Sequence, residues 1–197
     1  MNNDGFNVNN KPTKFLLAVL LCSSVACAEQ YLLNINHIRQ APMLCVPTSV
    51  AMVLEYYGEK VDQKELKRKI EDTELKDNDP RLYKGTSFWK TERALEEMGY
   101  KWEAKDFDIN NGNAGIALIK SEIRQGRPVL VAIDVKYGQH VVVVKGFTEK
   151  DILVSDPDEL DSTTKYSCME FRKIWRNDSE SRSLMKTEAK KKTKAAK

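Results

Sequence analysis

Apolar residues recur at helical spacing just after Cys45. The positions i, i+3, i+4 and i+7 of this segment are Val50, Val53, Leu54 and Tyr57. Pro47 suits the first turn, where a helix leaves backbone N–H groups without partners, and Gly58 suits the stop. No charged residue stands between Cys45 and Glu55. The pattern therefore predicts a central, mostly buried helix of about three turns with Cys45 at its N-terminus.

Two runs of branched apolar residues predict strands. The first, 140–144, reads His-Val-Val-Val-Val and should be buried on both faces, because no polar residue interrupts it. The second, 152–155, is separated from the first only by a short polar turn, so the two read as a hairpin. This hairpin would bring Asp156, which follows the second run, beside His140. A third buried strand is predicted for 128–133.

Helix starts and stops account for most of the remaining chain. Residues 62–65 resemble a capping box, and glycines end the helices predicted over 88–98 and 113–125. The charged segment 71–82 reads as a loop. These elements predict a single α+β domain in which the helix that begins at Cys45 packs on a small, mostly antiparallel sheet of about three to five strands. The sequence shows no internal repeat, phosphate-binding glycine loop or zinc-type spacing.

Charge is distributed unevenly over the 197 residues. Charged residues make up 31% of the chain and hydrophobic residues 41%, which is enough to bury a core. Removing +5 for residues 186–197 and +1 for residues 1–28 from the formal total of +3 leaves −3 for residues 29–185. This mildly acidic body argues against a nucleic-acid-binding domain built on a basic face.

The N-terminus has the parts of a secretory signal peptide: two lysines, an apolar run, and Ala26-Cys27-Ala28 as a cleavage site. The run is too short for a membrane-spanning helix, which needs about 20 residues. We therefore expect residues 1–28 to be removed and the protein to be exported, either to a periplasm or to the medium. The segment is also a weak lipoprotein box, in which a lipid on Cys27 would anchor the protein. Without that lipid, no stable membrane insertion is expected.

Residues 181–197 are expected to form a disordered, Lys-rich tail after a folded domain that spans residues 29–180. The last twelve residues are low in complexity and contain six lysines. Such a segment buries too little apolar area to offset the entropy of ordering it. Two interpretations of this tail remain: it binds an anionic surface through its lysines, or it is simply solvated.

Two cysteines, Cys45 and Cys168, remain after the signal. In an exported protein such a pair suggests a disulfide, and this alternative stays open. The position of Cys45 favours a reactive thiol instead, because the dipole at a helix N-terminus stabilises negative charge and lowers a thiol pKa. Since the thiolate is the reactive form, Cys45 is a candidate nucleophile.

A thiol nucleophile needs a base, and the chain contains two histidines, His37 and His140. His140 stands at the mouth of a buried strand, where it can face a helix packed on the sheet. Asp156 on the neighbouring strand could orient the imidazole, although Asp-Pro is also a turn signal. Gln40 lies five residues before Cys45, and its amide could join the Cys45 backbone N–H in stabilising an oxyanion.

Five segments match, in order, the motifs of one peptidase family. They are Gln40–Gly58, Gly85–Gly99, His140–Gly146, Val154–Pro157 and Glu170–Trp175. Together they cover roughly residues 30–176, and they resemble the papain-like cysteine peptidases of the double-glycine leader, or bacteriocin-processing, type.

The resemblance implies a papain-like fold and a cysteine peptidase that acts on peptides or proteins without a cofactor or metal. The signal-like N-terminus adds the expectation that this member stands alone and is exported. The implied roles are nucleophile for Cys45, general base and then acid for His140, orienting group for Asp156 and oxyanion donor for Gln40. The sequence departs from the family pattern in three ways. Val46 stands where the family has a glycine, and Gln40 precedes Cys45 by five residues where six are expected. The transporter domain that is usually fused to this peptidase is absent from the sequence. A catalytically weak or inactive peptide-binding module, and a related amidase or acyl transferase, are the alternatives.

Overall fold

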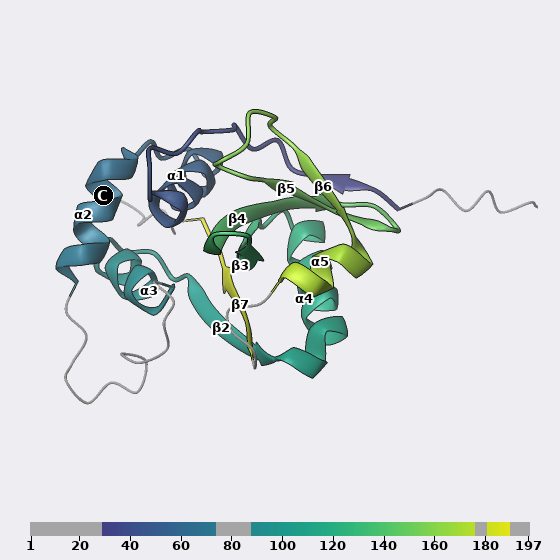
Figure 1. Cartoon of the computed structure of the whole chain (residues 1–197). Coiled ribbons are helices and arrows are strands. Elements are labelled where there is room, and N and C mark those ends of the chain that lie inside the picture. Colours follow the sequence, from purple (N-terminus) through teal and green to yellow (C-terminus); the bar gives the residue numbers. More distant parts are fainter. Residues whose placement is uncertain (1–28, 74–87, 176–180, 190–197) are drawn as a thin grey trace, which may run out of the picture.

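A computed structural model describes residues 29–73, 88–175 and 181–189. Within them, seven strands form one antiparallel sheet in the order β2-β7-β3-β4-β5-β6, and β1 pairs with β4 outside this path (Figure 1). The strands are β1 Tyr31–Leu32, β2 Glu103–Asp108, β3 Val129–Val135, β4 Gly138–Phe147, β5 Asp151–Ser155, β6 Thr164–Ser167 and β7 Ser181–Lys186. The helices are α1 Cys45–Tyr56, α2 Gln63–Asp72, α3 Phe88–Glu97, α4 Gly112–Arg124 and α5 Cys168–Ile174, with a 3-10 turn, η2, at Ile109–Asn111. The expected α+β class and the antiparallel sheet are confirmed.

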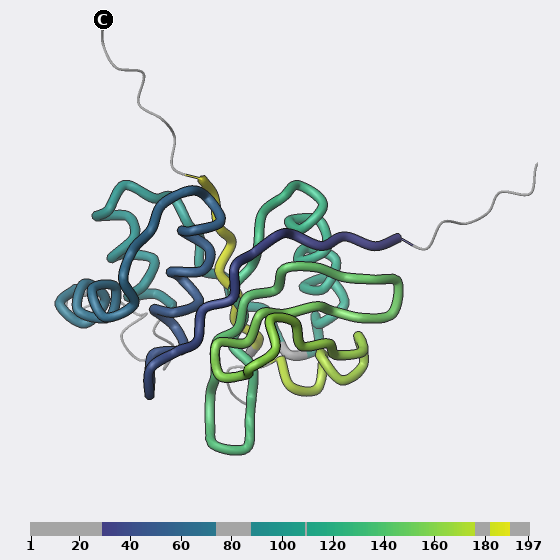
Figure 2. The backbone as a smooth tube through the Cα atoms, turned by 90° about the horizontal axis from the view of Figure 1, so that it is seen from above, coloured from purple at the N-terminus to yellow at the C-terminus, as the bar shows by residue number. Residues whose placement is uncertain are grey.

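Alternating residues of the central strands face two separate cores. In β3, Leu130 and Ala132 pack with α1, α2 and α3, whereas Val129, Val131 and Ile133 pack with α4 and α5. Figure 2 shows the first three helices on one side of the sheet and the last two on the other. Both faces of the central strands are therefore buried, which explains why these strands are uninterrupted apolar runs.

Helix α1 is fixed across the start of β4. The segment from Pro47 to Leu54 is buried throughout, and Gly58 follows the helix with a φ of +89°, a backbone conformation that favours glycine. The Ser49 hydroxyl donates a hydrogen bond of 3.0 Å to the backbone carbonyl of Val141 in β4. Because His140 directly precedes Val141, this contact sets the N-terminal half of α1 next to the histidine.

The sheet is wider than the expected three to five strands. The additional edge strands β2 and β6 are polar and mostly exposed or half-buried, so they carry no apolar run that a sequence pattern could detect. Strand β6 pairs with β5, and β2 pairs with β7.

The expected disordered tail is wrong for residues 181–189. Ser181–Lys186 form β7, which lies inside the sheet between β2 and β3. Its Leu184 and Met185 are fully buried, and the buried Arg182 guanidinium donates to the carbonyl oxygens of Arg172 and Trp175. The polar residues of β7 are thus satisfied by partners elsewhere in the chain, which local composition does not reveal. The folded domain extends past residue 180, and residues 190–197 lie outside the described residues.

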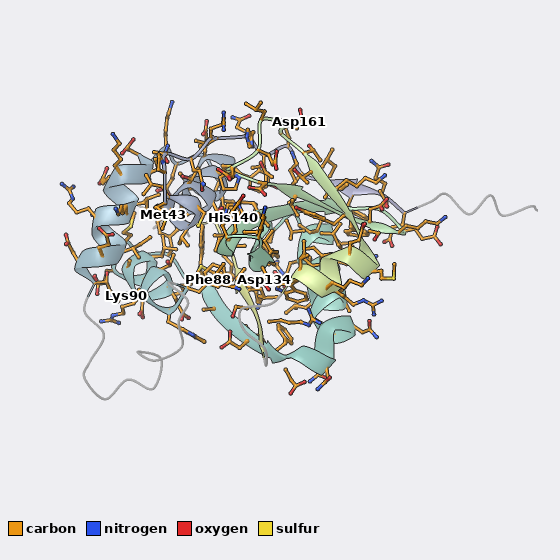
Figure 3. All side chains as sticks on the ribbon, viewed as in Figure 1. Met43, Phe88, Lys90, Asp134, His140 and Asp161 are labelled. Atoms are coloured by element: carbon orange, nitrogen blue, oxygen red, sulfur yellow. The ribbon has the colours of Figure 1, made fainter. Side chains whose placement is uncertain are left out.

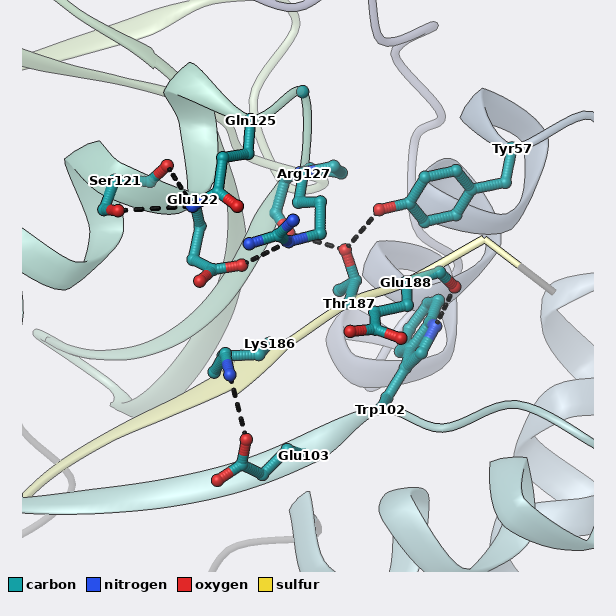
Figure 4. A network of polar contacts seen from close by, with 12 residues as sticks. Tyr57, Trp102, Glu103, Ser121, Glu122, Gln125, Arg127, Lys186, Thr187 and Glu188 are labelled. Carbon is teal, nitrogen blue, oxygen red and sulfur yellow. Dashed lines mark hydrogen bonds and ion pairs between the residues drawn. The ribbon is translucent and has the colours of Figure 1, made fainter. Parts of the chain in front are cut away.

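Polar contacts just beyond β7 tie the sheet to α1 (Figure 4). The Thr187 hydroxyl lies 2.9 Å from the Tyr57 hydroxyl at the end of α1, and it donates a hydrogen bond of 2.6 Å to the Pro128 carbonyl. The indole N–H of Trp102 donates to the Glu188 carbonyl at 2.8 Å. The segment after β7 therefore helps to hold α1 in place.

We predict that Leu184→Ala lowers the free energy of unfolding by about 2–5 kcal/mol, because it leaves a cavity at a fully buried position. Chemical denaturation followed by circular dichroism would measure this change. Glu188→Ala is the matched control, since the Glu188 side chain is exposed and should shift stability by no more than about 0.5 kcal/mol. Equal stability of Leu184→Ala and the parent protein would contradict the placement of β7 in the core.

Among the described residues, no helix combines the length and the apolar character that crossing a membrane requires. The predicted signal peptide, residues 1–28, lies outside the described residues.

Candidate active site

Cys45 occupies the first position of α1 and is half-buried. Leu44 precedes it and offers no side-chain cap, so no capping side chain occupies the N-terminal end of the helix. The imidazole of His140 and the backbone N–H groups of Val141 and Val46 lie close enough to the Cys45 thiol to lower its pKa. The predicted meeting of Cys45 and His140 is what the structure shows.

His140 and Asp156 form a buried pair. His140 Nε2 lies 2.6 Å from Asp156 Oδ1, and the two residues are only 8% and 5% exposed. The β4–β5 hairpin produces this contact as expected, because Asp156 directly follows β5 (Figure 3 labels His140). Since Nε2 is bound to the carboxylate, Nδ1 is the ring nitrogen left for the Cys45 thiol.

The electrostatics of the Cys45–His140 pair favour its charged form. Burial acts to raise the pKa of Cys45, but the hydrogen bond to His140, the two backbone N–H groups and the attraction of the imidazolium outweigh burial and lower it. Burial acts to lower the pKa of His140, but the bonds to Asp156 and Cys45 outweigh it and raise this pKa to about 10. The two groups titrate as a coupled pair, and both shifts favour the form in which a thiolate lies beside an imidazolium.

Gln40 is held by the turn that follows Asp156. Its backbone N–H donates to the Pro157 carbonyl at 2.9 Å, and its side-chain Nε2 donates to Asp158 Oδ1 at 3.0 Å. Gln40 Oε1 is buried and has no hydrogen-bond partner among the described residues. One amide hydrogen is therefore occupied by Asp158, and the other is the donor that remains for a substrate.

The other histidine belongs to the scaffold of this turn. His37 Nε2 donates to the Glu159 carbonyl at 3.0 Å, and Nδ1 lies 3.0 Å from the Ser155 hydroxyl. Both ring nitrogens are thus engaged away from Cys45, and His37 fastens residues 37–40 to the segment around Asp156.

Asp158 is a residue that the sequence reading missed. Its backbone N–H donates to Asp156 Oδ1 at 2.9 Å while its carboxylate accepts the Gln40 amide, so it connects the buried pair with the glutamine. The Asp156-Pro-Asp158 run signals only a turn, in which the N–H two residues after a carboxylate can bond back to it, and it does not indicate the contact of the Asp158 carboxylate with Gln40.

The disulfide alternative is contradicted. Cys45 and Cys168 are both free thiols, and they pack against the cores on opposite faces of the sheet. Within residues 29–73, 88–175 and 181–189, no cluster of three or more His, Cys, Asp or Glu side chains is arranged to hold a metal ion.

Comparisons with known proteins identify the family and the fold. The Peptidase_C39-like family model matches residues 32–183. No protein with a curated description matches the chain in sequence. Among solved structures, one from Bacillus anthracis described as a C39-like peptidase has a TM-score of 0.59 at 19% identity, covering 83% of this chain and 100% of that one.

Two further structures share the fold. The peptidase domain of Streptococcus ComA, a bi-functional ABC transporter involved in quorum sensing, has a TM-score of 0.53 at 18% identity, covering 76% of this chain and 94% of that one. A double-glycine-motif protease from an AMS/PCAT transporter, in complex with its leader peptide, has a TM-score of 0.54 at 20% identity. That alignment covers 80% of this chain and 95% of the other.

Proposed function

Because the chain belongs to the Peptidase_C39-like family, we propose that it is an exported cysteine peptidase that cleaves peptide bonds with Cys45. The observation that carries the proposal is the arrangement of three side chains: His140 lies close enough to the Cys45 thiol for each to shift the pKa of the other, and its Nε2 lies 2.6 Å from Asp156 Oδ1. A nucleophile, a base and a group that orients the base are the parts that acyl transfer by a thiol requires.

In the first half of the reaction, the Cys45 thiolate attacks the carbonyl carbon of the scissile bond. The carbonyl π electrons move to the oxygen, and a tetrahedral oxyanion forms. When that intermediate collapses, the C–N bond breaks and the His140 imidazolium gives its Nδ1 proton to the departing amine. The products are a free amine and a thioester between Cys45 and the acyl part of the substrate.

In the second half, neutral His140 takes a proton from a water molecule, whose oxygen attacks the thioester. The C–S bond breaks, the carboxylic acid leaves, and the Cys45 thiolate beside an imidazolium is restored. Asp156 keeps the same ring nitrogen oriented throughout and stabilises the positive charge on the ring.

We propose the Gln40 amide and the Cys45 backbone N–H as the donors for the oxyanion. The support is the fixed orientation of the amide, since Asp158 accepts one of its two hydrogens. Preorganised donors of this kind lower the barrier because they need no rearrangement when charge develops.

The proposed substrate is a peptide or an unfolded segment of a protein. One protein of the same fold, the AMS/PCAT protease, is in complex with a leader peptide, which supports a peptide in the corresponding place here. Export rests on the signal-like residues 1–28 and stays a prediction from the sequence.

The proposal is tested by the pH dependence of hydrolysis and of alkylation. The active form needs a thiolate on Cys45, whose pKa is lowered, and a proton on His140, whose pKa is raised to about 10. We therefore expect a bell-shaped profile whose acidic limb lies below the pH range in which an ordinary thiol ionises and whose alkaline limb falls as the pH passes about 10. Below a pH of about 8.5, where a free thiol is mostly protonated, iodoacetamide should modify Cys45 faster than it modifies such a thiol.

Peptide mapping would identify the modified residue, and protein unfolded in urea is the control for intrinsic thiol reactivity. A folded Cys45 that reacts no faster than the unfolded one below a pH of about 8.5 would favour the non-catalytic, peptide-binding alternative. Transfer of the acyl group to an added amine in preference to water would instead indicate an acyl transferase.

A further inference from the structure

A hollow of about 230 Å³ opens directly beside Cys45. It lies between the N-terminus of α1 and the second half of α2. Its lining is mostly apolar and consists of Met43, Cys45, Val46, Pro47, Lys67, Ile70 and Glu71. We call this hollow the Met43 pocket. The proposed nucleophile, Cys45, is thus one of the residues that line it.

The turn before α1 brings Met43 to the edge of the pocket. The Leu44 N–H donates to the Ala41 carbonyl at 3.1 Å, with Pro42 second and Met43 third in the turn. Met43 has a φ of +63°, in the left-handed region that normally favours glycine at this position of a turn. A strained methionine that is 89% exposed next to a nucleophile is more readily explained by binding than by packing.

Helix α2 supplies the opposite wall. Ile70 is 8% exposed and presents an apolar surface, while Lys67 and Glu71 form an exposed ion pair of 3.5 Å one turn apart. Lys67 and Glu71 can line the pocket with their carbon chains while their charges remain in water. The interior therefore offers apolar contact but no buried charge to pair with a charged ligand.

We propose that the Met43 pocket receives an aliphatic side chain, of about the size of leucine or methionine, from a residue that adjoins the scissile bond. The inference rests on the proposed function and adds a substrate class to it: peptides cleaved beside a bulky apolar residue. At attack the carbonyl carbon lies about 3–3.5 Å from the sulfur, so the side chain of a flanking residue can reach a hollow that Cys45 lines. Glycine would leave the hollow unfilled, and a charged side chain would lose hydration there without a partner.

The test has two stages. A mixture of peptides with varied sequences is digested, and the cleavage sites are mapped by mass spectrometry. Matched fluorogenic peptides that differ only at the preferred flanking position, with Leu, Gly or Glu, are then compared by kcat/KM. We expect Leu to exceed Gly by about 10- to 100-fold, since that is the range for burial of a leucine side chain.

Met43→Glu is the decisive variant, because an exposed position tolerates it without loss of the fold. The new carboxylate should reduce the Leu-to-Gly ratio at least about 5-fold and increase cleavage beside Lys. Ile70→Ala removes apolar surface from the α2 wall of the pocket and should also reduce the Leu-to-Gly ratio. Circular dichroism would check that this variant is folded. Met169→Ala is the control, since Met169 is 60% exposed on α5, whose packing is on the other face of the sheet, and the ratio should not change.

Cleavage without an apolar preference at either flanking position, or a ratio that Met43→Glu leaves unchanged, overturns the assignment of the pocket while leaving the peptidase proposal intact. Absence of all cleavage, together with a Cys45 that iodoacetamide does not modify rapidly near neutral pH, overturns the proposed function and the pocket assignment with it.

Discussion

Cys45→Ala is expected to abolish peptide hydrolysis, with a fall in kcat/KM on the order of 10⁶-fold, the loss typical of removing an activated nucleophile. The sulfur is the protein atom that attacks the substrate carbonyl in the proposed mechanism, so neither His140 nor Asp156 can compensate for its loss. Rapid modification by iodoacetamide near neutral pH should disappear with it. The Cys45 side chain is small and half-buried, so the variant should fold and still bind substrate.

Cys168→Ala is the matched control for this experiment. It removes the other described thiol, which lies at the start of α5 and packs against the core on the opposite face of the sheet. We expect near-normal kcat/KM for Cys168→Ala. Substantial hydrolysis by Cys45→Ala, or an equal loss in both variants, would show that Cys45 is not the nucleophile.

Asp156→Asn is expected to lower kcat by about 10²- to 10⁴-fold while it changes KM little. The amide keeps the shape of the carboxylate but not its charge, so the imidazolium of His140 loses its main stabilising partner. The His140 pKa should then fall, and the alkaline limb of the pH profile should move from about 10 to lower pH. The rate against pH, measured for both proteins, would show the shift directly.

Asp161→Asn controls for the loss of a negative charge. Asp161 lies in the loop that follows Asp156, is exposed, and is labelled in Figure 3. It should alter neither kcat nor the alkaline limb. If Asp156→Asn lowered kcat without moving that limb, the role of Asp156 would be structural rather than electrostatic.

The parts of the fold with local signals were predictable from the sequence. The helix at Cys45–Tyr56 follows from a period of 3.6 residues with a proline at its start and a glycine after it. The β4–β5 hairpin follows from two apolar runs joined by a short turn, and it correctly placed Asp156 beside His140. Each of these features depends on residues close together in the chain.

The parts that depend on distant partners were not predictable. The sequence of β7 carries no local signal of a strand, because arginine and serine residues are usually solvated. In the structure, however, Arg182 donates a hydrogen bond to the Trp175 carbonyl and Ser183 donates one to Asp106. The role of Asp158 was missed for the same reason, since its carboxylate acquires its partner, Gln40, only when segments 118 residues apart meet. A pattern in one stretch of sequence carries no information about a partner supplied by another.

The order in which the strands are synthesised leaves the newly made chain with unpaired strand edges. Strand β7, the last described strand to be synthesised, lies between β2 and β3 and connects them within the sheet. Until residues 181–186 follow, both strands carry unpaired edges, which are templates for aggregation. Every proposed catalytic group has been translated by residue 156, but the sheet beneath α1 is still open. A chain that ends before residue 181 would therefore carry the proposed catalytic groups on a sheet whose open edges favour aggregation.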